Sequence, residues 1–150
     1  MLHIRRVQTD DIDTEMNARL DHLLLDEEMH WDADQGRRFL ADDSNALFLA
    51  EIDGVAIGFA TVHRLQRFDA RRAEVLIYDI GVEEGARRQG VGRALIAHIN
   101  AWAKEAGADQ VWVLADGDDE RACAFYAGTG GERFGPDAAM FTYYLDETRA

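Results

Sequence analysis

The chain has 150 residues, of which 47% are hydrophobic and 30% charged, a balance that excludes a disordered or fibrous protein and predicts one globular domain over residues 1–150. Acidic residues outnumber basic ones by 29 to 16, and the formal net charge of −13 disfavours nucleic acid and anionic membranes and favours a cationic small-molecule partner. No apolar run approaches the roughly 20 residues that span a bilayer, so we expect a cytoplasmic protein.

The first 45 residues predict one strand and two helices. Residues 2–7 read as a strand, and a helix capped by Thr9 should follow. Its apolar residues recur at helical spacing: Ile12, Met16, Leu20, Leu23 and Leu24. A second, shorter helix is predicted over residues 34–40. Ten of the 29 acids lie between Thr9 and Asp34, so this part of the chain is suited to attract cations.

The middle of the chain predicts a β-hairpin followed by a long strand. Residues 46–52 and 55–65 are strand-like runs. They are joined by Asp53-Gly54, a pair that tolerates the positive φ angles of a tight turn. Residues 73–82, with the sequence AEVLIYDIGV, predict a third long strand. Three consecutive strands should therefore form a meander.

The rest of the chain alternates helices with strands. A helix is predicted over residues 88–106, a short buried strand over 111–115, a helix over 119–127 and a last strand over 139–145. This order of elements predicts a domain of the α+β class.

Residues 87–93, between the third long strand and the next helix, read Arg-Arg-Gln-Gly-Val-Gly-Arg. Glycines let a backbone approach a ligand closely, and the free N–H groups at a helix start favour a phosphate. The arginines would add charge-assisted hydrogen bonds, so the segment predicts an anion site, with a purely structural turn as the alternative. The lysine of a nucleotide-binding P-loop is missing, and Leu95 stands where a dinucleotide fingerprint has its third glycine.

Two motifs in this order resemble those of a known family. Arg87, Gly90 and Gly92 meet the pattern Arg/Gln-x-x-Gly-x-Gly/Ala after a strand that ends Tyr-Asp-Ile-Gly-Val, and Ala-x-x-Phe-Tyr follows at residues 122–126. On these residues the sequence resembles the GNAT superfamily of acetyl-CoA-dependent N-acetyltransferases. The resemblance implies a central mixed, mostly antiparallel sheet of six to seven strands with about four helices. It also implies acetyl-CoA in a splay between two central parallel strands, and it suggests a homodimer.

The closer resemblance is to the aminoglycoside 3-N-acetyltransferases of the gentamicin-resistance type. It rests on AEVLIYDI at residues 73–80, RRQG at 87–90 and ADGDD at 115–119, and it covers roughly half of the chain. It implies direct transfer, in a ternary complex, of an acetyl group to the 3-amino group of an aminoglycoside. The first 45 residues take no part in the resemblance, and they include the acidic helix expected on the substrate side. The resemblance therefore supports the assignment of the cofactor more strongly than that of the substrate.

The family resemblance also implies a set of acetyl-CoA contacts. The backbone of the strand end would pair with the pantetheine arm, and one strand N–H would polarise the acetyl carbonyl. The loop and the first helical turn would hold the pyrophosphate. The residues concerned are Ile80, Gly81, Val82, Arg87, Arg88, Gln89, Gly90, Val91, Gly92, Arg93, Asp119 and Tyr126. Tyr126 would also donate a proton to the departing thiolate, which suits a phenol with a pKa near ~10; its alternative is a tyrosine of the core beside Phe125.

Asp79 is the first choice for the catalytic base, or for the carboxylate that orients the amine. Strand alternation predicts that its side chain points away from the face shared by Tyr78 and Ile80. The alternative for Asp79 is a buried acid paired with an arginine such as Arg64. Glu74, nearer the start of the same strand, is the second candidate base.

Acidic and aromatic residues are the candidate substrate contacts. Trp31 and nearby acids such as Glu28 could pack on sugar rings and amines, although a tryptophan at a helix end more often belongs to the core. Asp116 and Asp118 could bind ammonium groups of the substrate, whereas Asp119 is better suited to cap the helix that follows. The candidate substrate-binding residues are Glu28, Trp31, Glu74, Tyr78, Asp79, Asp116 and Asp118.

Two alternatives to an aminoglycoside substrate stay open at this point. The first is the same chemistry on a polyamine, a small amine or a protein amino group, and the second is a coenzyme A-binding regulatory module without turnover. An acyl-enzyme mechanism through Cys123 is not favoured, because no histidine lies near it in the sequence. The five histidines are scattered without metal-ligand spacing, so we expect no metal.

Overall fold

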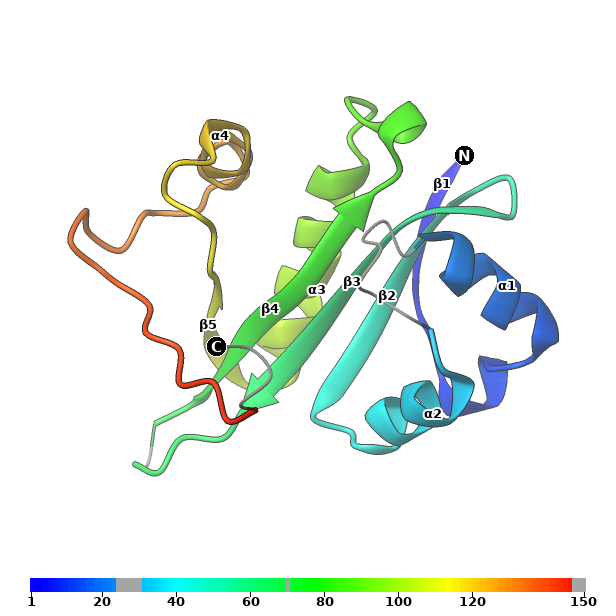
Figure 1. Cartoon of the computed structure of the whole chain (residues 1–150), viewed down its shortest axis with the longest axis horizontal. Coiled ribbons are helices and arrows are strands. Elements are labelled where there is room, and N and C mark those ends of the chain that lie inside the picture. Colours follow the sequence, from blue (N-terminus) through cyan, green and yellow to red (C-terminus); the bar gives the residue numbers. More distant parts are fainter. Residues whose placement is uncertain (24–30, 70, 147–150) are drawn as a thin grey trace. The chain divides into compact units, whose positions relative to one another are not determined.

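A computed structural model describes residues 1–23, 31–69 and 71–146 of the chain (Figure 1). The chain divides into two compact units, Met1–Leu114 and Ala115–Ala150. The first unit holds a five-stranded sheet and three of the α-helices, and the second unit holds the helix α4. That residues 1–150 form a single domain stays a prediction.

The sheet of the first unit has the strand order β1-β2-β3-β4-β5. Its strands are β1 (Leu2–Arg6), β2 (Asn45–Ile52), β3 (Val55–Leu65), β4 (Ala73–Val82) and β5 (Ala108–Val113). Neighbouring strands are antiparallel except for β4 and β5, which are parallel. The predicted mixed, mostly antiparallel sheet is therefore confirmed.

The predicted number of strands was wrong, because the described residues form a sheet of five strands where six to seven were expected. Residues 139–145, the predicted last strand, contain no strand, and their large apolar side chains are exposed, as in Phe141 at 83% and Tyr143 at 87%. An alternating apolar pattern makes a strand only where a neighbouring strand pairs its backbone and covers its side chains. No such neighbour pairs with this segment in the part of the chain that the structure describes.

The predicted hairpin between β2 and β3 is confirmed, and its turn shows why this sequence forms it. Asp53 has a φ of 51° and Gly54 a φ of 80°, so both central residues are left-handed. This is the backbone of a two-residue turn whose twist matches that of the flanking strands. Ile52 and Val55 are paired directly beside the turn, which sets the register of the meander.

The α-helices begin at a short polar side chain or a glycine, whereas the two 3-10 turns follow Gln8 and Glu83. They are η1 (Thr9–Asp11), α1 (Thr14–Leu23), α2 (Ala33–Ala41), η2 (Glu84–Ala86), α3 (Val91–Glu105) and α4 (Glu120–Gly128). Thr9 does not cap the first α-helix as predicted; it starts a 3-10 turn, and Asp13 Oδ1 accepts from the Met16 N–H at 2.8 Å. Asp32 and Asp119 accept the first N–H groups of α2 and α4, so the predicted role of Asp119 as a cap is confirmed.

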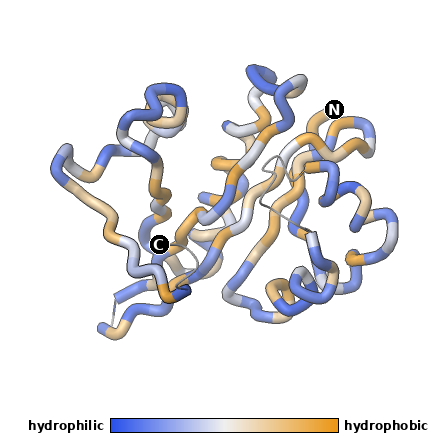
Figure 2. Tube along the Cα trace, viewed as in Figure 1, coloured by the Kyte–Doolittle hydropathy of each residue, from blue (hydrophilic) through white to orange (hydrophobic). Residues whose placement is uncertain are grey.

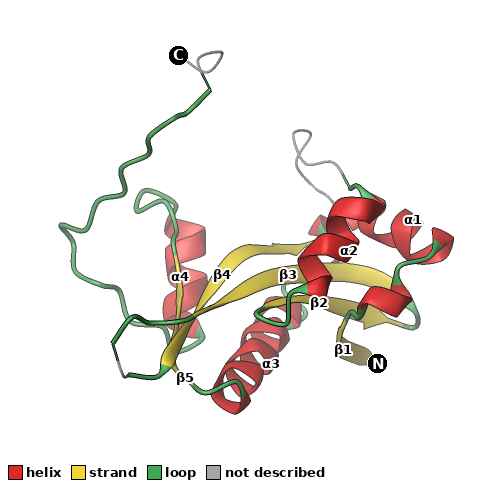
Figure 3. Cartoon of the chain, turned by 90° about the horizontal axis from the view of Figure 1, so that it is seen from below, coloured by secondary structure: helices red, strands yellow, loops and turns green. Residues whose placement is uncertain are grey.

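The first unit has three layers, with α1 and α2 on one face of the sheet and α3 on the other (Figure 3). On the α3 face, Val91, Leu95 and Ile99 are at most 1% exposed. On the α1 and α2 face, a second cluster joins Leu20 and Leu23 to the sheet. Hydrophobic stretches follow the central strands, and the outer turns are hydrophilic (Figure 2). Burial of these two apolar faces is the main term that holds the layers together.

Candidate active site

The loop from β4 to α3 has the backbone that a phosphate site needs. Arg88 has a φ of 66° and Gly90 a φ of 79°, so the chain turns sharply before the helix. Gly90 is the N-cap of α3 and has no side chain to satisfy the first N–H groups of the helix. Arg88 and Gln89 are exposed beside this helix start. The loop therefore presents N–H groups, a helix dipole and positive charge together, and these residues fit a pyrophosphate.

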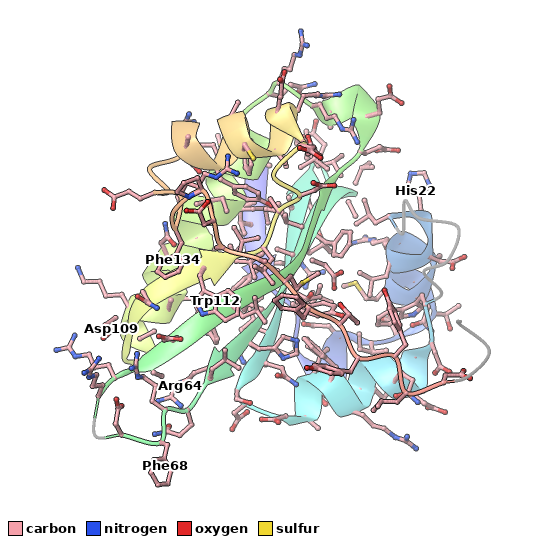
Figure 4. The ribbon with its side chains drawn as sticks, turned by 60° about the vertical axis from the view of Figure 1, so that its left-hand side comes forward. His22, Arg64, Phe68, Asp109, Trp112 and Phe134 are labelled. Carbon is pink, nitrogen blue, oxygen red and sulfur yellow. The ribbon has the colours of Figure 1, made fainter. Side chains whose placement is uncertain are left out.

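Three contacts fix the start of this loop. Glu83 follows β4, where its N–H donates to the carbonyl of Ile57 at 2.8 Å and its Oε1 lies 2.9 Å from Nε2 of His22, at the end of α1 (Figure 4). Arg87 turns back on the strand, and its Nε donates to the carbonyl of Val82 at 3.2 Å. The Arg87 side chain thus holds the loop against β4, and it is less available for a ligand than the sequence pattern predicts.

The two parallel strands are paired over only part of their length. The ladder between β4 and β5 runs from Ala73 to Ile77 on β4 and ends at Val113 on β5. From Tyr78 to Val82, β4 has no β5 partner among the described residues, and Ile80, Gly81 and Val82 are half-buried. The backbone at this end of β4 can pair with a ligand in an extended conformation, as the predicted splay requires.

A β-bulge places Asp79 differently from the prediction. The ladder between β3 and β4 pairs Thr61 with Asp79 and then skips Tyr78, which is the extra, bulged residue. The Tyr78 ring consequently contacts the ring of His63, two residues beyond Thr61 on the same face, with 5.8 Å between centroids. The prediction that Asp79 points away from the face of Tyr78 is therefore wrong, because the bulge interrupts the alternation. Both side chains lie on the α1 and α2 face.

Thr61 holds Asp79 through two hydrogen bonds, one to its carboxylate and one from its backbone N–H. The Thr61 hydroxyl donates to Asp79 Oδ2 at 2.6 Å and accepts from the Asp79 N–H at 3.1 Å. The alternative partner, Arg64, instead donates from Nε to the carbonyl of Ala106 at 2.8 Å, at the end of α3 (Figure 4). Asp79 is therefore oriented by a neutral hydroxyl, and the structure gives no ion pair between Asp79 and Arg64. A carboxylate oriented in this way can accept a proton or bind an ammonium group.

Asp79 and Thr61 lie at the wall of a cavity of about 650 Å³ beneath α1 and α2. The other lining residues are Leu20, Leu23, Trp31, Asp32, Gln35, Gly36, Arg38, Phe39, Leu40, Leu47 and Phe59. The structure thus brings two predicted site residues, Trp31 and Asp79, to one cavity. Its volume lies within the range typical of small-molecule sites.

Trp31 is a fixed wall of this cavity and not a free stacking platform. Its indole Nε1 donates to Asn17 Oδ1 at 2.8 Å. Its ring also lies against Gly36, where an added Cβ would come within 2.2 Å of the ring. Asp32, next to Trp31, accepts from the N–H groups of Asp34 and Gln35 and so caps α2. The predicted contact Glu28 lies outside the described residues.

Glu74 is the predicted site residue that the structure separates from the others. Its Oε1 accepts from Arg67 Nη1 and from Gln110 Nε2, each at 2.7 Å. It stands five residues before Asp79 on β4, or roughly 16 Å along an extended strand. Because Glu74 is neutralised by an arginine and lies away from the cavity, the structure does not favour it as the base.

The second unit holds the remaining predicted residues. Asp116 Oδ1 accepts from the Asp118 N–H at 3.0 Å and closes a turn, and Asp119 Oδ1 accepts from the Ala122 N–H at 3.0 Å. Tyr126, on α4, is half-buried, and its pKa is raised above the usual 10.0 by burial first and by the Asp119 carboxylate second. The Tyr126 phenol therefore keeps its proton at neutral pH, as a proton donor must.

Sequence reasoning missed Thr61, His63 and Asn45. His63 Nδ1 lies 2.8 Å from Asn45 Oδ1, and Asn45 Nδ2 donates to the carbonyl of Phe39 at 3.1 Å. The carbonyl fixes the orientation of the Asn45 amide and directs its Oδ1 toward His63 Nδ1. Asp79 was predicted because it is a polar residue in an otherwise apolar strand. Thr61 on β3 shows the same pattern and could have been found in the same way.

In the described part of the chain, no group of three or more His, Cys, Asp or Glu side chains could hold a metal ion. Over the same residues, none of the helices is both long enough and apolar enough to cross a membrane.

Comparison with known proteins identifies the class to which this fold and loop belong. Residues 11–130 match the model of the Acetyltransferase (GNAT) family, and the chain therefore belongs to this family. GNAT acetyltransferases use acetyl-CoA as the acetyl donor.

Two curated relatives are acetyltransferases. The chain is 34% identical to a mycothiol acetyltransferase of Frankia casuarinae, over 69% of this chain and 33% of the relative. It is 30% identical to a streptothricin acetyltransferase of Streptomyces lavendulae, over 73% of this chain and 56% of the relative. The chain thus spans about a third of the first relative and just over half of the second.

Solved structures of similar length include aminoglycoside acetyltransferases. Meta-AAC0020, from an uncultured soil metagenomic sample and in complex with sisomicin, is 25% identical with a TM-score of 0.85, and 97% of each chain is covered. AAC(6′)-Iy, in complex with a bisubstrate analogue, is 23% identical with a TM-score of 0.81, over 96% of this chain and 98% of the other. The second likeness shows the fold alone.

Proposed function

We propose that this protein transfers the acetyl group of acetyl-CoA to an amine of a cationic, aminoglycoside-type substrate. The observation that carries the proposal is the Asp79 carboxylate, which is oriented by Thr61 at a cavity wall where β4 loses its β5 partner. The net charge of −13 and the likeness to an aminoglycoside acetyltransferase that binds sisomicin support a cationic substrate.

Each chemical task has a residue of this chain proposed for it. Bound acetyl-CoA supplies a thioester whose acetyl carbon accepts an amine. The N–H groups at the start of α3 and the exposed Arg88 would hold its pyrophosphate. The edge of β4 at Ile80, Gly81 and Val82, which has no β5 partner among the described residues, would hold its pantetheine arm. Asp79 would orient the amine and accept its proton. Tyr126, which stays protonated at neutral pH, would return a proton to the departing sulfur.

The remaining cofactor and substrate contacts come from the sequence resemblance and from charge. For the cofactor they are Arg87, Gln89, Gly90, Val91, Gly92, Arg93 and Asp119; for the substrate they are Glu28, Trp31, Tyr78, Asp116 and Asp118. A homodimer and a cytoplasmic location also belong to this proposal. Light scattering of the purified protein tests the dimer.

The amine that is modified is proposed to be the 3-amino group, because residues 73–80 and 115–119 resemble the 3-N-acetylating type. AAC(6′)-Iy, which is similar in fold, is named for a different amine. Isotope-edited NMR of the acetylated sisomicin product distinguishes the two positions.

The test is release of free thiol from acetyl-CoA in the presence of sisomicin, gentamicin, spermidine or a lysine-containing peptide. Turnover with the two aminoglycosides, lost in Asp79→Asn and kept in Glu74→Gln, is the expected result. The Glu74→Gln variant is the matched control, because it neutralises a carboxylate on the same strand outside the cavity. Turnover only with the peptide or spermidine would overturn the aminoglycoside proposal. Tight coenzyme A binding without any turnover would identify a regulatory module instead.

A further inference from the structure

The cavity beneath α1 and α2 has a lining that suits a hydrocarbon. Seven of the thirteen lining residues carry large apolar side chains: Leu20, Leu23, Trp31, Phe39, Leu40, Leu47 and Phe59. Several belong to the hydrophobic cluster between the helices and the sheet, where Leu47 is 4% and Phe59 7% exposed. A ligand there would exchange water for apolar contacts along most of its length.

The charged groups of the cavity balance one positive charge and not several. The structure places two carboxylates and one guanidinium at its wall: Asp32, Asp79 and Arg38. Their formal charges add to −1. Asp32 Oδ1 is already engaged as the cap of α2, whereas Thr61 is the one hydrogen-bond partner of the Asp79 carboxylate among the described residues. A single ammonium at Asp79 would therefore complete the charge balance of the wall.

We propose that the site also acetylates primary monoamines that carry an apolar body, such as an n-alkyl chain of six to eight carbons or an arylalkyl group. The ammonium nitrogen would meet Asp79, and the hydrocarbon would lie among Phe59, Leu47 and the leucines of α1. The inference rests on the acetyl transfer of the proposed function and adds a substrate class to it. At this wall a polycationic sugar would meet the Arg38 guanidinium, and Asp79 is the one carboxylate among its described residues that does not also cap a helix.

The transfer to such an amine is balanced with the groups already named. The ammonium nitrogen first loses one proton, through Asp79, to water. The neutral amine then forms a bond to the acetyl carbon while the carbon–sulfur bond of the thioester breaks. As the amide forms, the nitrogen loses its second proton and the sulfur takes one proton. The products are an N-alkylacetamide and the free thiol of coenzyme A. No oxidant, reductant or metal is required.

The test is thiol release by the full chain with butylamine, hexylamine and octylamine at saturating acetyl-CoA. We expect kcat/KM to rise about threefold to fourfold for each added methylene until the cavity is filled, because each buried methylene contributes that factor. The matched control series has the same lengths but a second amine: 1,4-diaminobutane, 1,6-diaminohexane and 1,8-diaminooctane. For the diamines, kcat/KM should not rise with chain length, since a second charge would enter the apolar part of the cavity.

A charge variant sharpens this test. Arg38→Glu makes the wall more negative by two charges and should shift the ratio of kcat/KM for diaminooctane over octylamine upward by about tenfold. Arg72→Glu changes the net charge of the protein by the same amount, but Arg72 does not line the cavity, so the ratio should stay the same. An equal shift in both variants would show that the net charge, and not the cavity, selects the amine.

The outcomes separate this inference from the proposed function. Turnover of sisomicin with no turnover of octylamine overturns the inference and leaves the proposed function standing. Turnover of octylamine without sisomicin supports the inference and overturns the aminoglycoside substrate. A kcat/KM that does not change with chain length overturns the inference, and no turnover of any amine overturns both.

Discussion

The two halves of β4 differ in a way that explains where the chemistry lies. Over Glu74 to Ile77 the strand is paired on both sides, and its Glu74 carboxylate accepts hydrogen bonds from Arg67 and Gln110. Over Tyr78 to Val82 it keeps only its β3 partner among the described residues, and its Asp79 carboxylate is held by a hydroxyl beside a cavity. One strand thus carries one carboxylate that stabilises the fold and one that is available to a ligand.

The largest effect should come from Asp79→Asn, which keeps the shape of the side chain and removes its charge. We expect kcat/KM to fall about 10²- to 10⁴-fold, as for loss of a general base. Calorimetry should show unchanged binding of coenzyme A, since the proposed cofactor contacts do not include this side chain. A loss below threefold would show that the second half of β4 does not carry the base.

A variant of Tyr126 tests whether a residue outside β4 supplies the proton that the departing sulfur takes up. Because burial and Asp119 raise its pKa above 10.0, the phenol stays protonated as pH rises and is lost as a donor only above pH 10. Tyr126→Phe should therefore lower kcat by a constant factor of about 10² between pH 7 and 9.5. An alkaline fall of wild-type activity below pH 10 that is absent from the variant would contradict this assignment.

A smaller effect is expected from Thr61→Val, which removes the hydroxyl that orients Asp79. A hydrogen bond to a charged group contributes about 1.5–3 kcal/mol, so kcat/KM should fall roughly tenfold to a hundredfold. Thr61→Ser keeps the hydroxyl and should recover most of the activity. If both variants behaved alike, packing of the side chain and not its hydroxyl would be responsible.

The smallest effect on activity should come from Glu74→Gln in the paired half of β4. We expect kcat/KM to stay within about twofold, while loss of the charged hydrogen bonds lowers Tm by about 3 °C in a thermal melt. A hundredfold loss of activity with an unchanged Tm would reverse the comparison and make Glu74 the functional carboxylate.

Local sequence determined the elements that depend on local geometry. The two-residue turn at Asp53-Gly54 was predictable because both positions need positive φ, and the bounds of β3 and β4 were predicted to the residue. The loop before α3 was predictable for the same reason, because Gly90 takes a left-handed conformation that few other residues adopt without strain. The last strand was not predictable from its apolar alternation, since a strand exists only with a partner.

The sequence by itself therefore determined the family and the sharp turn before α3, and it predicted Asp79 ahead of Glu74 as the candidate base. Only the tertiary structure decided the face of β4 on which Asp79 and Tyr78 lie, because a bulge depends on how two strands pair and not on either strand alone. It also decided the partners of the two carboxylates. Thr61 and Gln110 lie 18 and 36 residues from their partners in sequence and reach them through the ladders of the folded sheet, whereas Arg67 reaches Glu74 from the loop between β3 and β4.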